Sequence, residues 1–352
     1  MDLAKVFTID RTGIKPLRGL IVLVAMVVPL GVMSAMGLEK YWLSLAFAML
    51  FTALSDLGGR YQRRVLSMGT VGIIGGLLTG LGFAIGGGPS GIVVMASFVI
   101  VLAAGLALKF GKHGFTSGLM LASWFLVAIS EPAGAHHTAA TSGWWQQALA
   151  WWIGAALWIA LTAIVWLVRG RQAQDPNFPE VPTDTTSMAL TGPVIMFAVI
   201  QALAVSVSVA IAFGLHLPNA DWMPISTMVA MKTSLDQATL ASVQRISGAV
   251  IGACLASLFL VTVDSKHVLQ AIVVLLAGIA ASTRAASYAL YCAAMATLVL
   301  IAEDVTHPTN FSEEARRVLF TFLGLGIGMV VLVLGGLISK YAASRSAQAP
   351  AA

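Results

Sequence analysis

The chain has 352 residues, of which 58% are hydrophobic and only 10% are charged. Ordinary soluble domains carry roughly 25% charged residues, so this composition excludes a typical water-soluble protein. The formal net charge of +5 does not indicate a nucleic-acid partner, because no basic cluster is interleaved with aromatic residues. Apolar runs recur near the roughly 20 residues that a helix needs to cross a bilayer, which indicates an integral membrane protein.

In chain order, the apolar runs predict an all-α integral membrane protein of about twelve transmembrane helices. We expect these spans at 19–37, 41–57, 66–86, 91–109, 115–131, 145–168, 190–215, 222–238, 240–262, 267–283, 286–303 and 317–339. A polar segment rich in proline and threonine separates the first six from the last six. The predicted domains are a six-helix repeat at 1–169, a cytoplasmic linker at 170–189, a second six-helix repeat at 190–340 and a tail at 341–352.

The distribution of basic residues predicts the orientation. Twelve spans place both termini on one side, and fifteen Lys and Arg residues fall on that side. Four fall on the other side, namely Lys40, Lys266, Arg316 and Arg317, with Lys232 set aside. Since basic residues collect in cytoplasmic loops, we expect both termini to be cytoplasmic, in a bacterial inner membrane.

Two pairs of residues indicate an internal repeat. Trp42 and Asp56 have the same separation as Trp222 and Asp236, and Lys112 and Glu131 have the same separation as Arg284 and Glu303. Six spans return the chain to its starting side, so the halves are expected to be parallel in orientation. Glycines spaced by four on the third, ninth and last spans predict close packing of helix backbones.

The second and eighth spans are short and end early in polar residues. Short or interrupted segments at matching places of two repeats point to the translocation pathway of a transporter. Asp56 and Asp236 end these spans, and a carboxylate there could carry a coupling proton; the alternative is a helix-end carboxylate paired with a nearby arginine. Glu131 and Glu303 end the fifth and eleventh spans, where a solvated residue at the mouth is the alternative to a proton relay.

Lys232 lies about ten residues, or roughly 15 Å, inside the eighth span, which is close to the bilayer midplane. An unpaired lysine there costs about 2.5–3.5 kcal/mol on insertion scales, so it is expected to face a cavity or a partner. One interpretation is an ion pair with Asp236 or snorkelling toward the cytoplasm. Another is a positively charged binding position for an anionic substrate, flanked by Thr233 and Ser234. A third interpretation is a role in proton transfer.

No motif for enzyme chemistry is found. The sequence has no GxxxxGK[ST] phosphate loop, no HExxH and no GxSxG. His136, His137 and the acidic residues near 304–314 lack a diagnostic metal spacing. We therefore expect no enzyme activity, no cofactor and no metal.

Residues 222–252 carry a family resemblance. Trp222 opens the segment, Lys232 follows ten residues on, and an Ala-Thr-Leu run at 238–240 precedes Arg245; Gly248 and Gly252 complete it. This pattern resembles the fusaric acid resistance and aromatic acid exporter family, which is related to the plant aluminium-activated malate transporters. The resemblance is strong over 222–335. It is weaker over 18–90, where Trp42, Asp56, Gly59 and Arg63 or Arg64 form a degenerate copy.

The resemblance implies export of small organic acids, often with a periplasmic membrane-fusion partner, and a basic residue such as Arg245 near the anion pathway. We expect a proton-coupled efflux transporter of aromatic or hydrophobic carboxylic acids. Lys232 and Arg245 would attract the carboxylate, while Trp222 and Trp42 either line the pathway or anchor the outer ends in the lipid interface. A passive organic-anion channel and a non-transporting subunit of an envelope complex remain alternatives.

Overall fold

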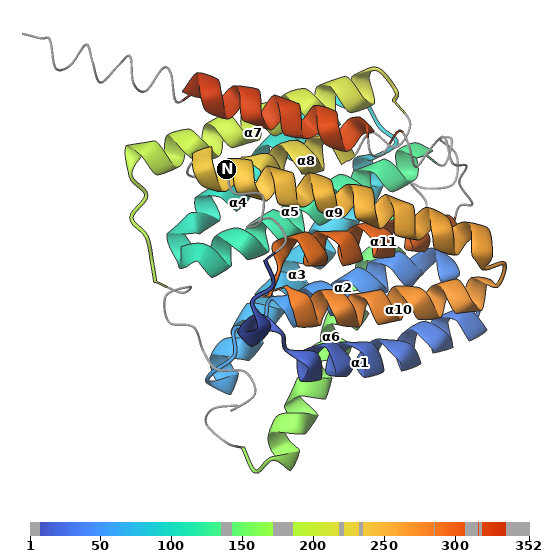
Figure 1. Cartoon of the computed structure of the whole chain (residues 1–352). Coiled ribbons are helices and arrows are strands. Elements are labelled where there is room, and N and C mark those ends of the chain that lie inside the picture. The colour runs from blue at the N-terminus through green and yellow to red at the C-terminus, as the bar shows by residue number, and fades with distance from the viewer. Residues whose placement is uncertain are drawn as a thin grey trace, which may run out of the picture.

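The structure is a computed structural model that describes residues 8–134, 143–171, 186–217, 222–231, 235–284, 286–306, 316 and 319–335, without the side chains of 133–134, 235–242 and 303–306. Every regular element in those ranges is helical. The helices are α1 (Pro16–Ala35), α2 (Trp42–Leu54), α3 (Tyr61–Ile85), α4 (Ser90–Leu106), α5 (Gly111–Gly134), α6 (Trp144–Val168), α7 (Gly192–Gly214), α8 (Trp222–Ala230), α9 (Leu235–Thr262), α10 (Lys266–Thr283) and α11 (Tyr288–Thr306). A last helix, Leu319–Gly335, follows them, and Figure 1 shows the arrangement.

The predicted class, an all-helical membrane protein, is confirmed. Within the described residues, seven helices are long and apolar enough to cross a membrane. One of them is a continuous run of 43 residues, Ser90–Pro132. It turns at Gly111, whose φ is 83°, and α4 packs against α5, so the chain reverses there. The helices overlap the predicted spans, but the predicted bounds of the eighth span are wrong: α8 ends at Ala230 and α9 begins at Leu235, so Asp236 lies at the start of the ninth helix and does not end the eighth. The number of complete crossings stays a prediction.

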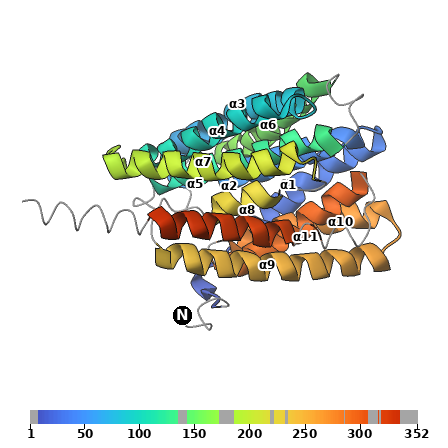
Figure 2. The same cartoon turned by 90° about the horizontal axis from the view of Figure 1, so that it is seen from above.

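The two short helices α2 and α8 lie in the interior. They have 13 and 9 residues, which correspond to about 20 Å and 14 Å at 1.5 Å per residue, whereas the hydrocarbon core is about 30 Å thick. All residues of α2 are buried, as are eight of the nine in α8. Figure 2 shows α8 between α7 on one side and the last helix with α9 on the other. The prediction that these two segments are short is confirmed.

In two places a helix from the first half of the chain packs against a helix from the second half, and we call these the crossed pairs. The helix α1 lies against α10, and α7 lies against α4. A methyl group added at Gly19 of α1 would overlap the carbonyl oxygen of Gly278 on α10. A methyl group added at Gly105 of α4 would come within 2.7 Å of the Ala198 Cβ on α7. Each interface therefore depends on a residue without a side chain, as close helix packing in membranes does.

A backbone hydrogen bond lies near one end of each crossed pair. The N–H of Lys15, just before α1, donates to the carbonyl of Ser282 in α10 at 2.9 Å. The N–H of Met188, before α7, donates to the carbonyl of Lys109 after α4 at 3.1 Å. Backbone hydrogen bonds thus join the first and second halves of the chain at two places.

The glycines spaced by four make the close contacts that their spacing predicts. A methyl group added at any of them would meet a neighbouring helix: Gly72, Gly76 and Gly80 face α6, Gly248 and Gly252 face α11, and Gly324 and Gly328 face α8. The last helix thereby packs on α8 as α6 packs on α2.

Candidate functional site

The C-terminal end of α2 is the centre of the candidate site. The turn that follows it contains Gly58 and Gly59, both with φ near 70° (71° and 72°), a conformation that glycine adopts without strain. Asp56 accepts a hydrogen bond from the Gly58 N–H at 3.0 Å, a turn that aspartate favours. The turn leads into α3, which begins at Tyr61 and carries Arg64 back toward Asp56.

Asp56 and Arg64 form a buried bidentate ion pair. The Nε of Arg64 donates to Oδ1 of Asp56 at 2.8 Å, and its Nη2 donates to Oδ2 at 2.7 Å. The two side chains are only 3% and 6% exposed. The sequence left a proton-carrying role and a paired carboxylate open for Asp56. The geometry is that of the paired carboxylate, and the proton-coupling role stays a prediction.

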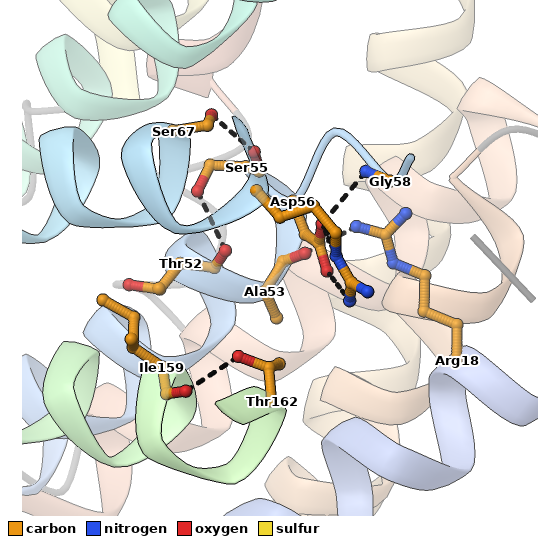
Figure 3. A network of polar contacts seen from close by, with 10 residues as sticks. Arg18, Thr52, Ala53, Ser55, Asp56, Gly58, Ser67, Ile159 and Thr162 are labelled. Atoms are coloured by element: carbon orange, nitrogen blue, oxygen red, sulfur yellow. Dashed lines mark hydrogen bonds and ion pairs between the residues drawn. The ribbon is translucent and has the colours of Figure 1, made fainter. Parts of the chain in front are cut away.

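The last carbonyls of α2, which have no partner within a helix that ends there, are met by side chains from several helices. The carbonyl of Thr52 accepts from Ser55 Oγ, that of Ala53 from Arg18 Nη2, that of Leu54 from Arg284 Nη1 at 2.8 Å, and that of Ser55 from Ser67 Oγ. Figure 3 shows the Arg18 guanidinium beside the Asp56 carboxylate. Two arginines, one from each half, therefore meet at one helix end.

From the sequence, Arg18 is only an orientation charge, and Arg284 is an orientation charge and a marker of the predicted repeat. Arg18 lies in the first turn of α1, and Arg284 directly follows α10. Their convergence depends on the packing of α1 against α10, which the sequence does not reveal. The one available signal is the early end of the second span, because a buried helix end requires hydrogen-bond donors from elsewhere.

Arg245 lies on α9, in the second half of the chain. It contacts Tyr288 and Cys292 of α11, and Tyr291 interacts electrostatically with both Arg245 and Arg284. The Nε of Arg245 is buried and has no hydrogen-bond partner among the described residues. Tyr291 therefore links Arg284, near the end of α2, to Arg245 by electrostatic interactions.

Three guanidiniums and the Asp56 carboxylate come together in this region. Arg18 interacts electrostatically with Arg64 and Arg284, both repulsive, and with the single carboxylate of Asp56. The C-terminal end of a helix adds about half a negative charge. Arginine does not lose its proton in proteins, so all three guanidiniums stay charged.

The predicted residues around Lys232 lie outside the described part of the chain. This holds for Lys232, Thr233 and Ser234, while Asp236 lies in α9 without a described side chain. Glu303 lies in α11, also without a described side chain. For all five, the predicted roles stay predictions.

Glu131 is partly buried near the C-terminal end of α5. None of the arginines described above is on that helix. Its proton-coupling role stays a prediction. Among the described side chains, no three metal-ligating groups come together.

Trp42 and Trp222 begin the two short helices and point into the protein. They are 1% and 6% exposed, so they do not face lipid as an anchoring belt would. The anchoring interpretation is wrong for both, because each short helix is covered on all sides. Their indole Nε1 atoms are buried without a partner among the described residues.

The short helices are fixed by polar side chains of their neighbours. In α8, Thr227 donates to the carbonyl of Gly324 at 3.0 Å and lies 2.8 Å from the Ser208 hydroxyl. In α2, Ser44 donates to Gln147 of α6 at 2.6 Å. Thus α8 is tied to α7 and to the last helix, and α2 is tied to α6.

Comparison with known proteins finds that part of the chain is similar to one family. Residues 205–331 match the family model described as fusaric acid resistance protein-like. No curated protein and no solved structure matches the chain. The matched segment includes part of α7, all of α8, α9, α10 and α11, and most of the last helix, and with them Arg245 and Arg284. The resemblance seen in the sequence is confirmed, and the second half of the chain carries a fusaric acid resistance protein-like region.

Proposed function

We propose that this protein is an inner-membrane efflux transporter of small organic acids, with its pathway between the two halves. The observation that carries the proposal is the group of arginines that meet near the end of α2. Arg18 and Arg64 come from the first half and Arg284 and Arg245 from the second, and Asp56 binds Arg64 and interacts electrostatically with Arg18. A carboxylate is the anion that an arginine guanidinium binds best in two-point geometry.

The proposed architecture is twelve crossings in two parallel repeats, with both termini in the cytoplasm. It is supported by the crossed packing of α1 on α10 and α7 on α4. If the two halves arose by duplication, the first helix of each half would lie against the fourth helix of the other. The pairs α1 with α10 and α7 with α4 match this expectation. The short helices α2 and α8 are the second helix of each half.

The proposed substrates are aromatic or hydrophobic carboxylic acids. The carboxylate would interact with Lys232 and Arg245, with Thr233 and Ser234 beside it and Trp222 lining the path. Since α8 ends at Ala230 after about 14 Å of helix, a residue just beyond it would lie near the midplane. Proton coupling would use Asp56 or Asp236, with Glu131 and Glu303 toward the outer side, and a periplasmic membrane-fusion protein is the proposed partner.

The experiment uses purified protein reconstituted in lipid vesicles with radiolabelled benzoate. Transport against a benzoate gradient, driven by a pH difference, would support a carrier, whereas flux only down the gradient would identify a passive channel. The Lys232→Met variant is expected to insert normally and to lose benzoate flux. Normal flux in that variant, or no flux by the wild type with any of a panel of aromatic and aliphatic acids, would contradict the proposal.

A further inference from the structure

The two short helices differ in how their side chains are held. Phe47 and Phe51 of α2, Trp124 of α5 and Trp151 of α6 form a closed cycle of four buried aromatic rings. Between ring centroids, Phe47 lies 5.0 Å from Trp124 and 5.5 Å from Phe51, and Trp151 lies 5.1 Å from Trp124 and 6.2 Å from Phe51. Since aromatic pairs interact best in a few mutual orientations, a shift of α2 against α5 or α6 would break several of these contacts at once.

A hydrogen bond joins the same cycle to α3 in one arrangement. The Trp124 Nε1 donates to Thr79 Oγ1 at 2.8 Å, and Thr79 donates to the carbonyl of Gly75 at 2.7 Å. An indole N–H is a donor only, and a hydroxyl has one proton. Thr79 must therefore accept from Trp124 and give its own proton to Gly75, which leaves these three groups no alternative pattern.

In α8 a threonine stands in the place of the first phenylalanine. Thr227 is the sixth residue of α8, as Phe47 is of α2, and no aromatic residue follows Trp222 in α8. The Thr227 hydroxyl lies 3.0 Å from the carbonyl oxygen of Gly324 in the last helix and 3.0 Å from that of Met223 in its own helix. Because it has one proton, it donates to one of them at a time. The bond between α8 and the last helix can therefore be exchanged for a bond within α8.

Ser208 of α7 keeps Thr227 hydrogen-bonded in either arrangement. The two hydroxyl oxygens are 2.8 Å apart, and Ser208 also lies 3.1 Å from the carbonyl oxygen of Ala204. Ser208 can donate to Thr227 while Thr227 donates to either of its two carbonyls. The carbonyls themselves lie inside helices and keep their backbone partners. Thus α8 can break its bond to the last helix without leaving a buried hydroxyl unpaired.

The helices that cover the two short helices differ in the same sense. Gly324 and Gly328 of the last helix lie directly against α8, and Figure 2 shows the last helix beside it. Neither glycine has a side chain that could interlock with α8. In the first half, α6 places the ring of Trp151 against Phe51 of α2. The last helix therefore offers less resistance to a shift of α8 than α6 offers to a shift of α2.

The C-terminal ends of the two short helices have different donors. The last carbonyls of α2 accept from the charged guanidiniums of Arg18 and Arg284. The carbonyl of Met228 in α8 accepts from the neutral amide of Gln201 at 3.2 Å. Hydrogen bonds from charged donors are roughly twice as strong as those between neutral groups. The contacts of the described side chains therefore hold the end of α2 more firmly than that of α8.

We propose that α8 is the moving element of this protein and that α2 is fixed. In the movement, α8 shifts along the last helix while Thr227 exchanges the Gly324 carbonyl for that of Met223 and stays bonded to Ser208. Packed interfaces change between discrete arrangements, and a hydroxyl with two acceptors provides two of them. The inference rests on the proposed function in one respect, namely that the movement opens and closes the pathway for the organic anion.

Cysteine cross-links test the movement in lipid vesicles. Ala230→Cys with Gly328→Cys joins α8 to the last helix, and Ala48→Cys with Gly154→Cys is the matched pair for α2 and α6. A Cβ added at Gly328 comes within 2.8 Å of the Ala230 Cβ, and one added at Gly154 comes within 2.9 Å of the Ala48 Cβ. Each pair therefore needs a similar small adjustment to reach the roughly 3.5–4.5 Å between the Cβ atoms of a disulfide.

Both pairs are made in a chain whose native cysteines, Cys254 and Cys292, are replaced by alanine. Transport of radiolabelled benzoate is measured before oxidation, after oxidation and after dithiothreitol, and peptide mass spectrometry gives the cross-linked fraction. The α8 pair should lose transport on oxidation and regain it with dithiothreitol, which excludes misfolding as the cause. The α2 pair should transport equally in all three states. Undiminished transport by the cross-linked α8 pair, or equal loss in both pairs, would overturn the proposal.

Hydrogen exchange of the wild-type chain in detergent needs neither a variant nor transport. Peptides that cover Trp222–Ala230 and Trp42–Leu54 are compared by mass spectrometry after correction for intrinsic exchange rates. Backbone that opens more readily exchanges faster, so the amides of α8 should exchange faster than those of α2. Equal or slower exchange in α8 would overturn the proposal even if the cysteine pairs fail to fold. Faster exchange in α8 with no benzoate flux by the wild type would keep the moving element and remove the transport function.

Discussion

The carboxylate of Asp56 is held by the guanidinium of Arg64 at both oxygens, at 2.8 Å from Nε and 2.7 Å from Nη2. The pair joins the end of α2 to the first turns of α3 across a two-glycine turn. It lies where helices of both halves meet, so its stability and its charge bear on the proposed pathway.

Asp56→Asn is expected to lower the free energy of unfolding by about 3 kcal/mol, because a buried pair that loses one partner leaves an uncompensated charge. Adding Arg64→Gln should recover part of that loss. The measurement is thermal unfolding in detergent followed by circular dichroism. A double variant less stable than the sum of the two single changes would contradict the pairing.

Gly19→Leu is expected to destabilise the protein by about 1–3 kcal/mol or more, because the new side chain would overlap the backbone of α10 at Gly278. Gly31→Leu on the same helix is the control, since nothing lies within 4 Å of a Cβ added there. Both variants are compared by melting temperature and by yield of monodisperse protein. Equal behaviour of the two would mean that α1 does not pack on α10 as described.

Thr79→Val tests a buried polar contact in the first half. The Trp124 Nε1 donates to Thr79 Oγ1 at 2.8 Å, and valine would leave the indole N–H unpaired. The expected loss is about 1–2 kcal/mol, with a change in the near-ultraviolet tryptophan signal. Thr70→Val, exposed on the same helix, should change neither. An unaltered tryptophan signal in Thr79→Val would argue against the contact.

Lys266→Gln tests the ion pair with Glu39, in which the two side chains are 52% and 30% exposed at an N–O distance of 2.8 Å. Pairs this exposed contribute about 0–1 kcal/mol, so the melting temperature should hardly change. Raising the salt concentration should affect wild type and variant alike. A large loss would mean that the pair is shielded from water.

Several features of the fold follow from the sequence. The positions of the helices follow from the apolar runs, and the glycine contacts follow from spacing by four. The early ends of α2 and α8 follow from polar residues such as Asp56. These features depend on neighbours in the chain, which a sequence displays directly.

The arginine group does not follow from the sequence. Arg18 and Arg284 are separated by most of the chain, and each stands beside an apolar run where a basic residue is expected for orientation alone. Their meeting is decided by the packing of α1 on α10. For Trp42 and Trp222, the outer position was predicted but their burial was not, because burial depends on the helices that surround α2 and α8.

The central claim is that arginines of both halves form one path for organic anions. It is tested most directly by the initial rate of pH-driven benzoate transport in vesicles, with Arg18→Gln for the first half, Arg284→Gln for the second and Arg60→Gln as the control. The account predicts that the first two each reduce the rate about ten-fold or more while Arg60→Gln transports as the wild type does. Wild-type rates in both Arg18→Gln and Arg284→Gln, at equal amounts of inserted protein, would contradict it.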